Sequence, residues 1–235
     1  MSAKKIAACG LATALLLAVQ FALSNVQGVE LVTVLLLSFC YAFGAFYGVL
    51  TATAFSLLRC LIFGFNPVVV VLYLIYYNLF AIIFGFVGKK CLPVWVCPVL
   101  LAVLAVLSGY LAGTGLPVSI LYQKRLSVML WVLFGITTGL LLFYFIVLLL
   151  KRGDTGREIA SVTALAAFMT VLFTLLDDVL EPLFYGWSMG AAVGYFYTSF
   201  LAMLPQMICS ALTVFLLFYP LKRIFFAAAG RKESD

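Results

Sequence analysis

The chain has no histidine and very little charge. Only 9% of its 235 residues are Asp, Glu, Lys or Arg, whereas 66% are hydrophobic. A soluble domain needs a polar and charged surface, so this composition excludes a soluble globular protein. The absence of histidine removes the commonest metal ligand and general base, which weakens every hypothesis of an intramembrane metalloenzyme.

Other absences narrow the function further. The pattern G-x-x-x-x-G-K-[ST] does not occur, so the chain does not hydrolyse nucleotide through a P-loop. The six cysteines are scattered through apolar runs without a C-x-x-C pair, which is typical of small buried residues rather than metal ligands. We therefore expect no cofactor, no bound metal and no enzymatic activity.

Apolar stretches of about 20 residues, separated by short polar breaks, recur from end to end, as transmembrane helices require. They predict an all-α integral membrane protein, a bundle of about eight transmembrane helices in a single domain, 1–235. The run 30–63 is too long for one crossing, and Gly44 and Gly48 predict a break within it. The expected spans are 6–24, 30–43, 46–63, 68–88, 93–113, 126–150, 158–181 and 194–220.

The basic residues indicate the orientation of these spans. Eleven of the fourteen Lys and Arg residues fall on one side of the eight-span arrangement, at 4–5, 89–90, 151–157 and 222–232. Cytoplasmic loops are enriched in such residues, so both termini are expected in the cytoplasm. The same bias explains the net charge of +6 without a nucleic-acid partner. We expect a multi-pass protein of the bacterial cell (inner) membrane.

Charged groups inside spans are costly and usually functional. Arg59 lies about one turn inside the outer end of the third span, where it would either snorkel to the interface or anchor an anionic ligand group.

Three acidic residues crowd the outer end of the seventh span. Glu181 follows Asp177 by four residues and Asp178 by three, so it lies close to both on a helix. All three face the negative end of the helix dipole, where carboxylates are disfavoured. They form either a solvated helix end before Pro182 or an outward-facing site. Such a site needs a cation, protonation or a basic side chain such as Arg59.

Aromatic and amide side chains accompany these charges on the expected outer side. Single tyrosines and tryptophans are ordinary interfacial anchors. Their concentration beside the acids and Arg59 is instead typical of a pocket for a flat, partly polar molecule. The residues expected to bind substrate are Arg59, Tyr73, Tyr77, Asn78, Asp178, Glu181, Trp187, Tyr195 and Gln206.

The first span carries a stripe of small residues, Ala8-x-x-x-Ala12 with Gly10 inside it, followed by Ala14-x-x-x-Ala18. Small residues four apart allow another helix to approach closely. That helix belongs either to the same chain or to a partner.

Together with this stripe, several later segments resemble the substrate-binding S components of energy-coupling factor (ECF) transporters. The resemblance covers residues 1–90 and 158–225 and has soft, hydrophobic motifs. They are Ala8-x-x-x-Ala12, Val29–Thr33, the glycines at 44 and 48, Phe63–Phe65, Tyr73–Asn78, and the closing Tyr195 with Tyr219–Lys222.

The resemblance implies a subunit that captures a vitamin or similar micronutrient and performs no chemistry. It implies a six-helix core, a binding site near the outer face, and docking through Ala8 and Ala12 on a transmembrane coupling protein driven by two ABC ATPases. Residues 93–150 would then be an extra helix pair. Met203, Gln206 and Ser210 stand where similar last helices carry Asp, His and Asn.

Other functions remain compatible with the residues. A self-sufficient secondary carrier would couple substrate to protons through Asp177, Asp178 or Glu181. A structural or assembly subunit would leave these acids merely solvated. An intramembrane enzyme is disfavoured, because adjacent aspartates point about 100° apart on a helix whereas catalytic pairs converge from different elements.

Overall fold

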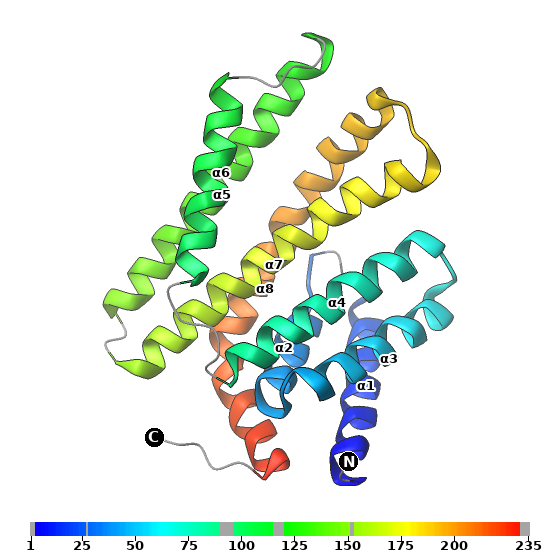
Figure 1. Ribbon diagram of the computed structural model, residues 1–235, viewed down its shortest axis with the longest axis vertical. Coiled ribbons are helices and arrows are strands. Elements are labelled where there is room, and N and C mark those ends of the chain that lie inside the picture. The colour runs from blue at the N-terminus through cyan, green and yellow to red at the C-terminus, as the bar shows by residue number, and fades with distance from the viewer. Residues whose placement is uncertain (1–2, 27, 90–95, 115–119, 151–152, 231–235) are drawn as a thin grey trace. The chain divides into compact units, whose positions relative to one another are not determined.

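The structure is a computed structural model that describes the chain except for residues 1–2, 27, 90–95, 115–119, 151–152 and 231–235 and the side chains of 97, 120–121 and 200–203. The described chain is helical throughout and has no strand. Its helices (Figure 1) are α1 (Ala3–Leu23), α2 (Val32–Phe43), α3 (Ala45–Phe63), α4 (Pro67–Val87), α5 (Val96–Thr114), α6 (Ile120–Leu150), α7 (Asp154–Tyr185) and α8 (Met189–Ala229).

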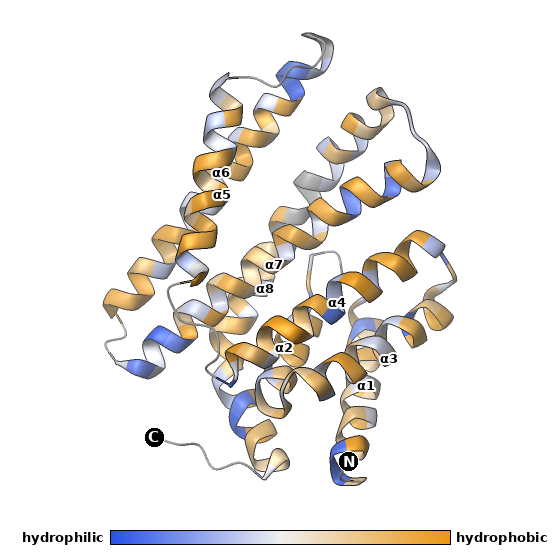
Figure 2. Cartoon of the chain, in the orientation of Figure 1, coloured by the Kyte–Doolittle hydropathy of each residue, from blue (hydrophilic) through white to orange (hydrophobic). Residues whose placement is uncertain are grey.

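Six of these helices are long and apolar enough to cross a membrane: α1, α3, α4, α6, α7 and α8. The apolar helix α2 is shorter, and so is the continuously described part of α5, Pro98–Thr114. Figure 2 shows hydrophobic residues along most of each helix, with the strongly hydrophilic ones gathered mainly towards helix ends. The chain is a multi-pass membrane protein, and its predicted all-α character is confirmed, whereas eight crossings stay a prediction.

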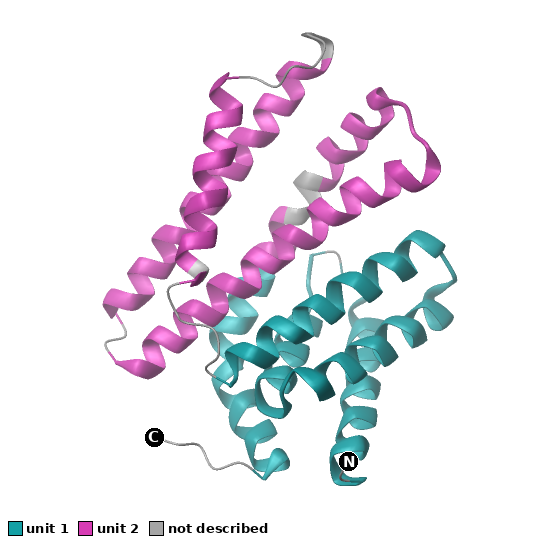
Figure 3. Cartoon of the chain, in the orientation of Figure 1, with its two compact units in different colours: residues 1–93, 209–235 teal, residues 94–208 magenta. Residues whose placement is uncertain are grey.

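The chain divides into two compact units (Figure 3). Unit 1 contains residues 1–93 and 209–235, and unit 2 contains residues 94–208. Helix α8 therefore contributes its first part to unit 2 and its last part to unit 1. Helix α7 belongs with α5 and α6, whereas the resemblance implied a core of 1–90 and 158–225. The expected start of the fifth span, at 93, lies outside the described residues.

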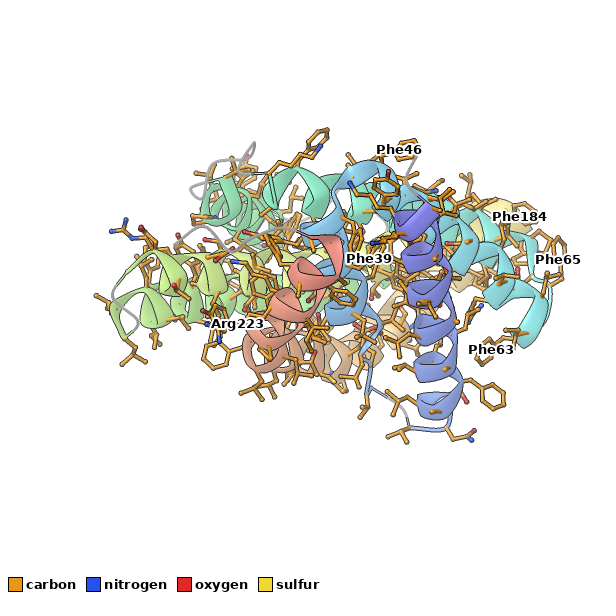
Figure 4. The ribbon with its side chains drawn as sticks, turned by 90° about the horizontal axis from the view of Figure 1, so that it is seen from below. Phe39, Phe46, Phe63, Phe65, Phe184 and Arg223 are labelled. Carbon is orange, nitrogen blue, oxygen red and sulfur yellow. The ribbon has the colours of Figure 1, made fainter. Side chains whose placement is uncertain are left out.

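Unit 1 is built around α2. Ten of the twelve residues of this short helix are buried, and α1, α3 and α4 all pack against it. A helix that is apolar on every side is buried on every side. At its end, Phe39 stacks on Phe43 with a centroid distance of 4.5 Å and meets Phe225 of α8 edge-on at 5.7 Å (Figure 4).

Gly44 makes the corner between α2 and α3. Its φ of +87° lies in the region that favours glycine, and its N–H donates to the carbonyl oxygen of Cys40 at 2.8 Å. Gly48, which was also expected in the break, instead lies inside α3. A Cβ there would lie 2.7 Å from Cys40 Sγ, so Gly48 serves close packing rather than the turn.

Helix α4 begins with a standard cap and ends in backbone contact with this corner. Asn66 caps the helix, accepting a hydrogen bond at Oδ1 from the N–H of Val68 at 3.0 Å, and Pro67 occupies the first turn. At the other end, a Cβ on Gly85 would overlap the backbone nitrogen of Ala45. A Cβ on Gly88 would overlap the carbonyl oxygen of Tyr41.

The two ends of α3 carry large exposed apolar side chains. Phe46, in the first turn, is 64% exposed, and Phe65, just after the helix, is 74% exposed. Both point away from the ribbon in Figure 4. In a membrane-spanning hairpin such side chains meet lipid or the interface, where aromatic rings are favoured.

In unit 2, α5 and α6 lie side by side and α7 packs on both (Figure 1). Gly109 of α5 allows the approach of α6, since a Cβ there would lie 3.0 Å from Cδ2 of Phe134. Helix α7 is the most buried of the long apolar helices. Its small residues, including the alanines at 160, 164, 166 and 167, are all covered.

Helix α7 does not end before Pro182, as the sequence suggested, but continues to Tyr185. The proline lies in the last turn, where the loss of one backbone hydrogen bond is tolerated. The helix is closed by Gly186 in the left-handed conformation, with a φ of +61°, and its N–H donates to the carbonyl of Pro182. The N–H of Trp187 donates to the same oxygen at 3.0 Å.

The backbone contact at the α2–α3 corner predicts that Gly85→Ala lowers the free energy of unfolding by about 1–3 kcal/mol, because backbone cannot yield as a flexible side chain does. Gly10→Ala is the matched control in the same unit, since nothing lies within 4 Å of its Cβ. It should be neutral or stabilising by about 0.5–1 kcal/mol. Thermal unfolding of the full chain in detergent measures both, and equal stability of the two variants would contradict the contact.

Candidate functional site

The nine residues predicted to bind substrate fall in both units, and each group is described within its own unit. Unit 1 holds Arg59, Tyr73, Tyr77 and Asn78. Unit 2 holds Asp178, Glu181, Trp187, Tyr195 and Gln206.

Arg59 lies against aromatic rings one turn before the end of α3. Its guanidinium carbon is 4.4 Å from the ring centroid of Tyr73 on α4 and 5.3 Å from that of Phe63. Its Nε is buried and has no hydrogen-bond partner. The side chain therefore gains cation–π contact, while one strong donor is left unused.

A residue from α1 reaches the same tyrosine. Gln20 donates a hydrogen bond from Nε2 to the Tyr73 hydroxyl at 3.4 Å, and its Oε1 is buried without a partner. Helices α1, α3 and α4 thus meet at Tyr73. Gln20 was not predicted, although an amide near the end of an otherwise apolar span is a recognisable signal.

The tyrosines of α4 are buried rather than interfacial. Tyr73, Tyr76 and Tyr77 are each at most 8% exposed, and fully buried Phe55 of α3 packs among them. Ring centroids lie 5.0 Å apart for Tyr73–Tyr77 and Tyr76–Tyr77, and 5.2 Å apart for Phe55–Tyr77. Buried tyrosine rings keep their hydroxyls paired, so this cluster combines flat apolar faces with polar tips.

Glu30, immediately before α2, supplies a negative charge to this cluster. Its carboxylate acts electrostatically on the hydroxyls of Tyr73, Tyr76 and Tyr77. Its Oε1 accepts a hydrogen bond from the Thr33 hydroxyl at 2.6 Å. Glu30 was not among the residues predicted to bind substrate, although it belongs to the segment Val29–Thr33.

Asn78 joins α3 to α4. Its Oδ1 accepts a hydrogen bond from the Thr53 hydroxyl at 2.9 Å. One turn further along α3 from Thr53, the Ser56 hydroxyl donates a hydrogen bond to the carbonyl oxygen of Tyr73 at 3.2 Å. These bonds set the register of the two helices that carry Arg59 and the tyrosines.

The alanine stripe of α1 faces the interior of unit 1. Ala12 is 7% exposed and forms a core cluster with Cys9 and Phe39, and Ala8 packs partly buried against it. This is the placement expected for packing within the chain. Gly10, Ala14 and Ala18, also four apart, are exposed, as are Ala3, Ala7 and Ala22.

In unit 2, the acids at the end of α7 lie in different surroundings. Asp178 is 4% exposed; its Oδ1 accepts a hydrogen bond from Ser199 of α8, and its Oδ2 is buried without a partner. Asp177 accepts a hydrogen bond from the Tyr195 hydroxyl at 2.8 Å. Glu181 is only partly buried. The carboxyl group of Asp178 is therefore buried and is not solvated at the helix end.

In the described part of unit 2, no basic side chain forms an ion pair with these acids. Lys124 and Arg125, at the start of α6, are exposed, and neither pairs with an acid of α7. Above the acids, Trp187 meets the ring of Tyr195 edge-on at 5.2 Å and stacks with Tyr185 at 6.2 Å.

The remaining predicted positions lie along α8. Gln206 is partly buried, and Ser210 is fully buried in the part of α8 that belongs to unit 1. The side chain of Met203 lies outside the described residues.

One motif was overlooked in the sequence: Gly186–Gly190 reads G-W-S-M-G and matches the spacing G-x-S-x-G. A nucleophilic serine of that type needs a strand-to-helix turn and a histidine base. Here the segment joins two helices, Ser188 accepts a hydrogen bond from the N–H of Ala191, and the chain has no histidine. Ser188 is a helix cap.

Comparison with known proteins found no matching family model, no matching curated protein and no matching solved structure.

The geometry around Tyr73 predicts different effects for two substitutions. Tyr73→Phe removes only the hydroxyl bonded by Gln20, whereas Tyr73→Leu also removes the ring beneath Arg59. Tyr73→Leu should therefore destabilise the chain by about 0.5–2 kcal/mol more than Tyr73→Phe. When Arg59→Ala is also present, the difference in stability between Tyr73→Phe and Tyr73→Leu should be smaller, because the ring then has no guanidinium to contact. Thermal unfolding of the four variants measures the coupling, and an unchanged difference would contradict the stacked geometry.

Proposed function

We propose that this chain is the membrane-embedded substrate-capture subunit of an ECF-type ABC importer for a vitamin or similar micronutrient. The proposal rests on Arg59, an intramembrane cation held against Tyr73 with a buried, unpartnered Nε. Such a charge is costly within a membrane, and a ligand that accepts its hydrogen bond would account for its presence. The resemblance in the sequence gives the class of importer.

The groups around Tyr73 describe the ligand that would bind. Arg59 Nε offers a donor and Gln20 Oε1 an acceptor, and neither is used within the chain. A flat molecule with a carbonyl next to an N–H would satisfy both while lying along the tyrosine rings. Glu30 would add attraction for positive charge on the same molecule.

The proposed arrangement has eight membrane crossings, with α2 and α5 as the short ones and both termini in the bacterial cytoplasm. The positive-inside bias of the basic residues supports this orientation. Arg59 then lies near the outer end of α3, accessible to a ligand arriving from outside. The chain itself would need no cofactor and perform no reaction.

The proposed partners are a transmembrane coupling protein and two ABC ATPases. Because Ala12 packs inside unit 1, we assign the docking surface on α1 to the exposed small residues Gly10, Ala14 and Ala18, rather than to Ala8 and Ala12. Small residues at this spacing would admit a partner helix to close contact.

A co-purification experiment tests ligand capture. The wild-type chain, purified in mild detergent from its native host and then denatured, should release a small molecule detectable by mass spectrometry. Arg59→Ala should release at least tenfold less, because a charged hydrogen bond to a ligand contributes about 1.5–3 kcal/mol. Arg223→Ala removes an exposed arginine that is bonded to Tyr219 and should match the wild type. Equal amounts from all three chains, or none from the wild type, would reject the site.

A pull-down of the tagged chain from native membranes tests the partners. It should recover two ABC ATPases and a coupling protein, and Ala14→Trp should reduce their yield. Leu61→Trp places the same bulk on a 75% exposed position of α3 and should leave the yield unchanged. Recovery of the chain alone, in conditions that keep a known ECF complex intact, would favour a self-sufficient ion-coupled carrier.

A further inference from the structure

A buried carboxylate in unit 2 has no counter-charge among the residues of that unit that the structure describes. Asp178 is 4% exposed and lies near the end of α7, within a helix apolar enough to cross a membrane. Ser199 donates to its Oδ1, and its Oδ2 is buried with no hydrogen-bond partner. An ionised carboxylate in such surroundings is strongly disfavoured unless it is paired or neutralised.

The charged groups near Asp178 destabilise the ionised form of its carboxyl group further. Asp177 acts on it electrostatically with the same sign, and Glu181 is one turn further along α7. The other titratable side chains on the elements packed at this end are Tyr195 of α8, which donates to Asp177, and Tyr122 of α6, which lies against Gly190. The rest are exposed: Lys124 and Arg125 on α6, Tyr110 on α5, Tyr185 at the end of α7 and Tyr197 on α8.

A proton fits this position better than a metal ion does. A metal ion needs several oxygen ligands, and Asp178 Oδ2 has no polar partner beside it. Among the residues searched, which are the described ones, no three His, Cys, Asp or Glu side chains converge on one point. A proton needs one oxygen. A neutral carboxyl group keeps Oδ1 as the acceptor for Ser199 and carries its hydrogen on Oδ2.

We propose that Asp178 is a proton-binding site of this protein, occupied at neutral pH, and that the Ser199 hydroxyl positions it. Asp177 stays ionised beside it, because it is partly exposed and accepts the hydrogen bond of Tyr195. An exchangeable proton within a membrane-spanning helix is the element that a proton-linked conformational step requires. The site lies in unit 2 and does not depend on ligand capture in unit 1.

Infrared spectroscopy of the full chain in lipid nanodiscs tests this site. The wild type at neutral pH should show the C=O stretching band of a protonated carboxyl group. Asp178→Asn should remove that band, whereas Asp177→Asn, a change of the adjacent carboxylate, should retain it. Raising the pH until the group ionises should abolish the band in the wild type. Persistence of the band in folded Asp178→Asn, or its absence from the wild type, would overturn the proposal.

A second variant keeps the test decisive if Asp178→Asn does not fold. Ser199→Ala removes the hydrogen bond to Oδ1, so the same band should move to higher frequency without disappearing. An unmoved band in this variant would show that it arises from another carboxyl group and would overturn the proposal. Replacing sodium with choline in the buffer should leave the band unchanged, and a band that appears only without sodium would assign the site to that metal ion instead. None of these readouts depends on the ligand or partners of unit 1, so either proposal can fail alone.

Discussion

Backbone contact between α4 and the α2–α3 corner is the constraint on which unit 1 depends. Gly85 and Gly88 carry no side chains, and the backbone at Ala45 and Tyr41 occupies the space that a Cβ would need. Between apolar helices in lipid, close packing rather than the hydrophobic effect provides the attraction. This contact sets the end of α4, and the capped end at Asn66 sets its start. The tyrosines between them are therefore held at fixed positions.

The groups that surround the buried charge differ between the two units. In unit 1, the guanidinium of Arg59 lies on the ring of Tyr73, and the carboxylate of Glu30 acts on the same tyrosine. Positive and negative groups thus share one aromatic cluster. In unit 2, Asp178 has only a hydroxyl partner and acidic neighbours. A ligand would complete the first arrangement, whereas neutralisation would complete the second.

These arrangements suit a membrane protein that is almost entirely helical and has few charged residues. Recognition and any response to protons then have to be built from side chains within the spans, where each polar group is costly. Gln20, Thr53 and Ser56 are examples of such polar groups, because each donates a hydrogen bond to α4 from another helix. The proposed capture of a flat ligand and the proposed proton at Asp178 both use groups that the fold leaves unsatisfied.

The sequence by itself determined the membrane class, the helical fold and the approximate helix positions, since run length and apolar composition depend only on local residues. It also indicated Arg59, Tyr73 and Asp178 as candidate site residues, because charged and tyrosine side chains stand out in an apolar chain. It could not distinguish Asp178 from Glu181, three residues further along the same helix end, because the contact that covers Asp178 comes from Ser199 of α8. Nor could it place Gln20 and Glu30 beside Tyr73, turn Ala12 inward, or assign Gly44 to the corner and Gly48 to packing. Those outcomes were decided by the tertiary structure, because they depend on contacts between residues far apart in the chain.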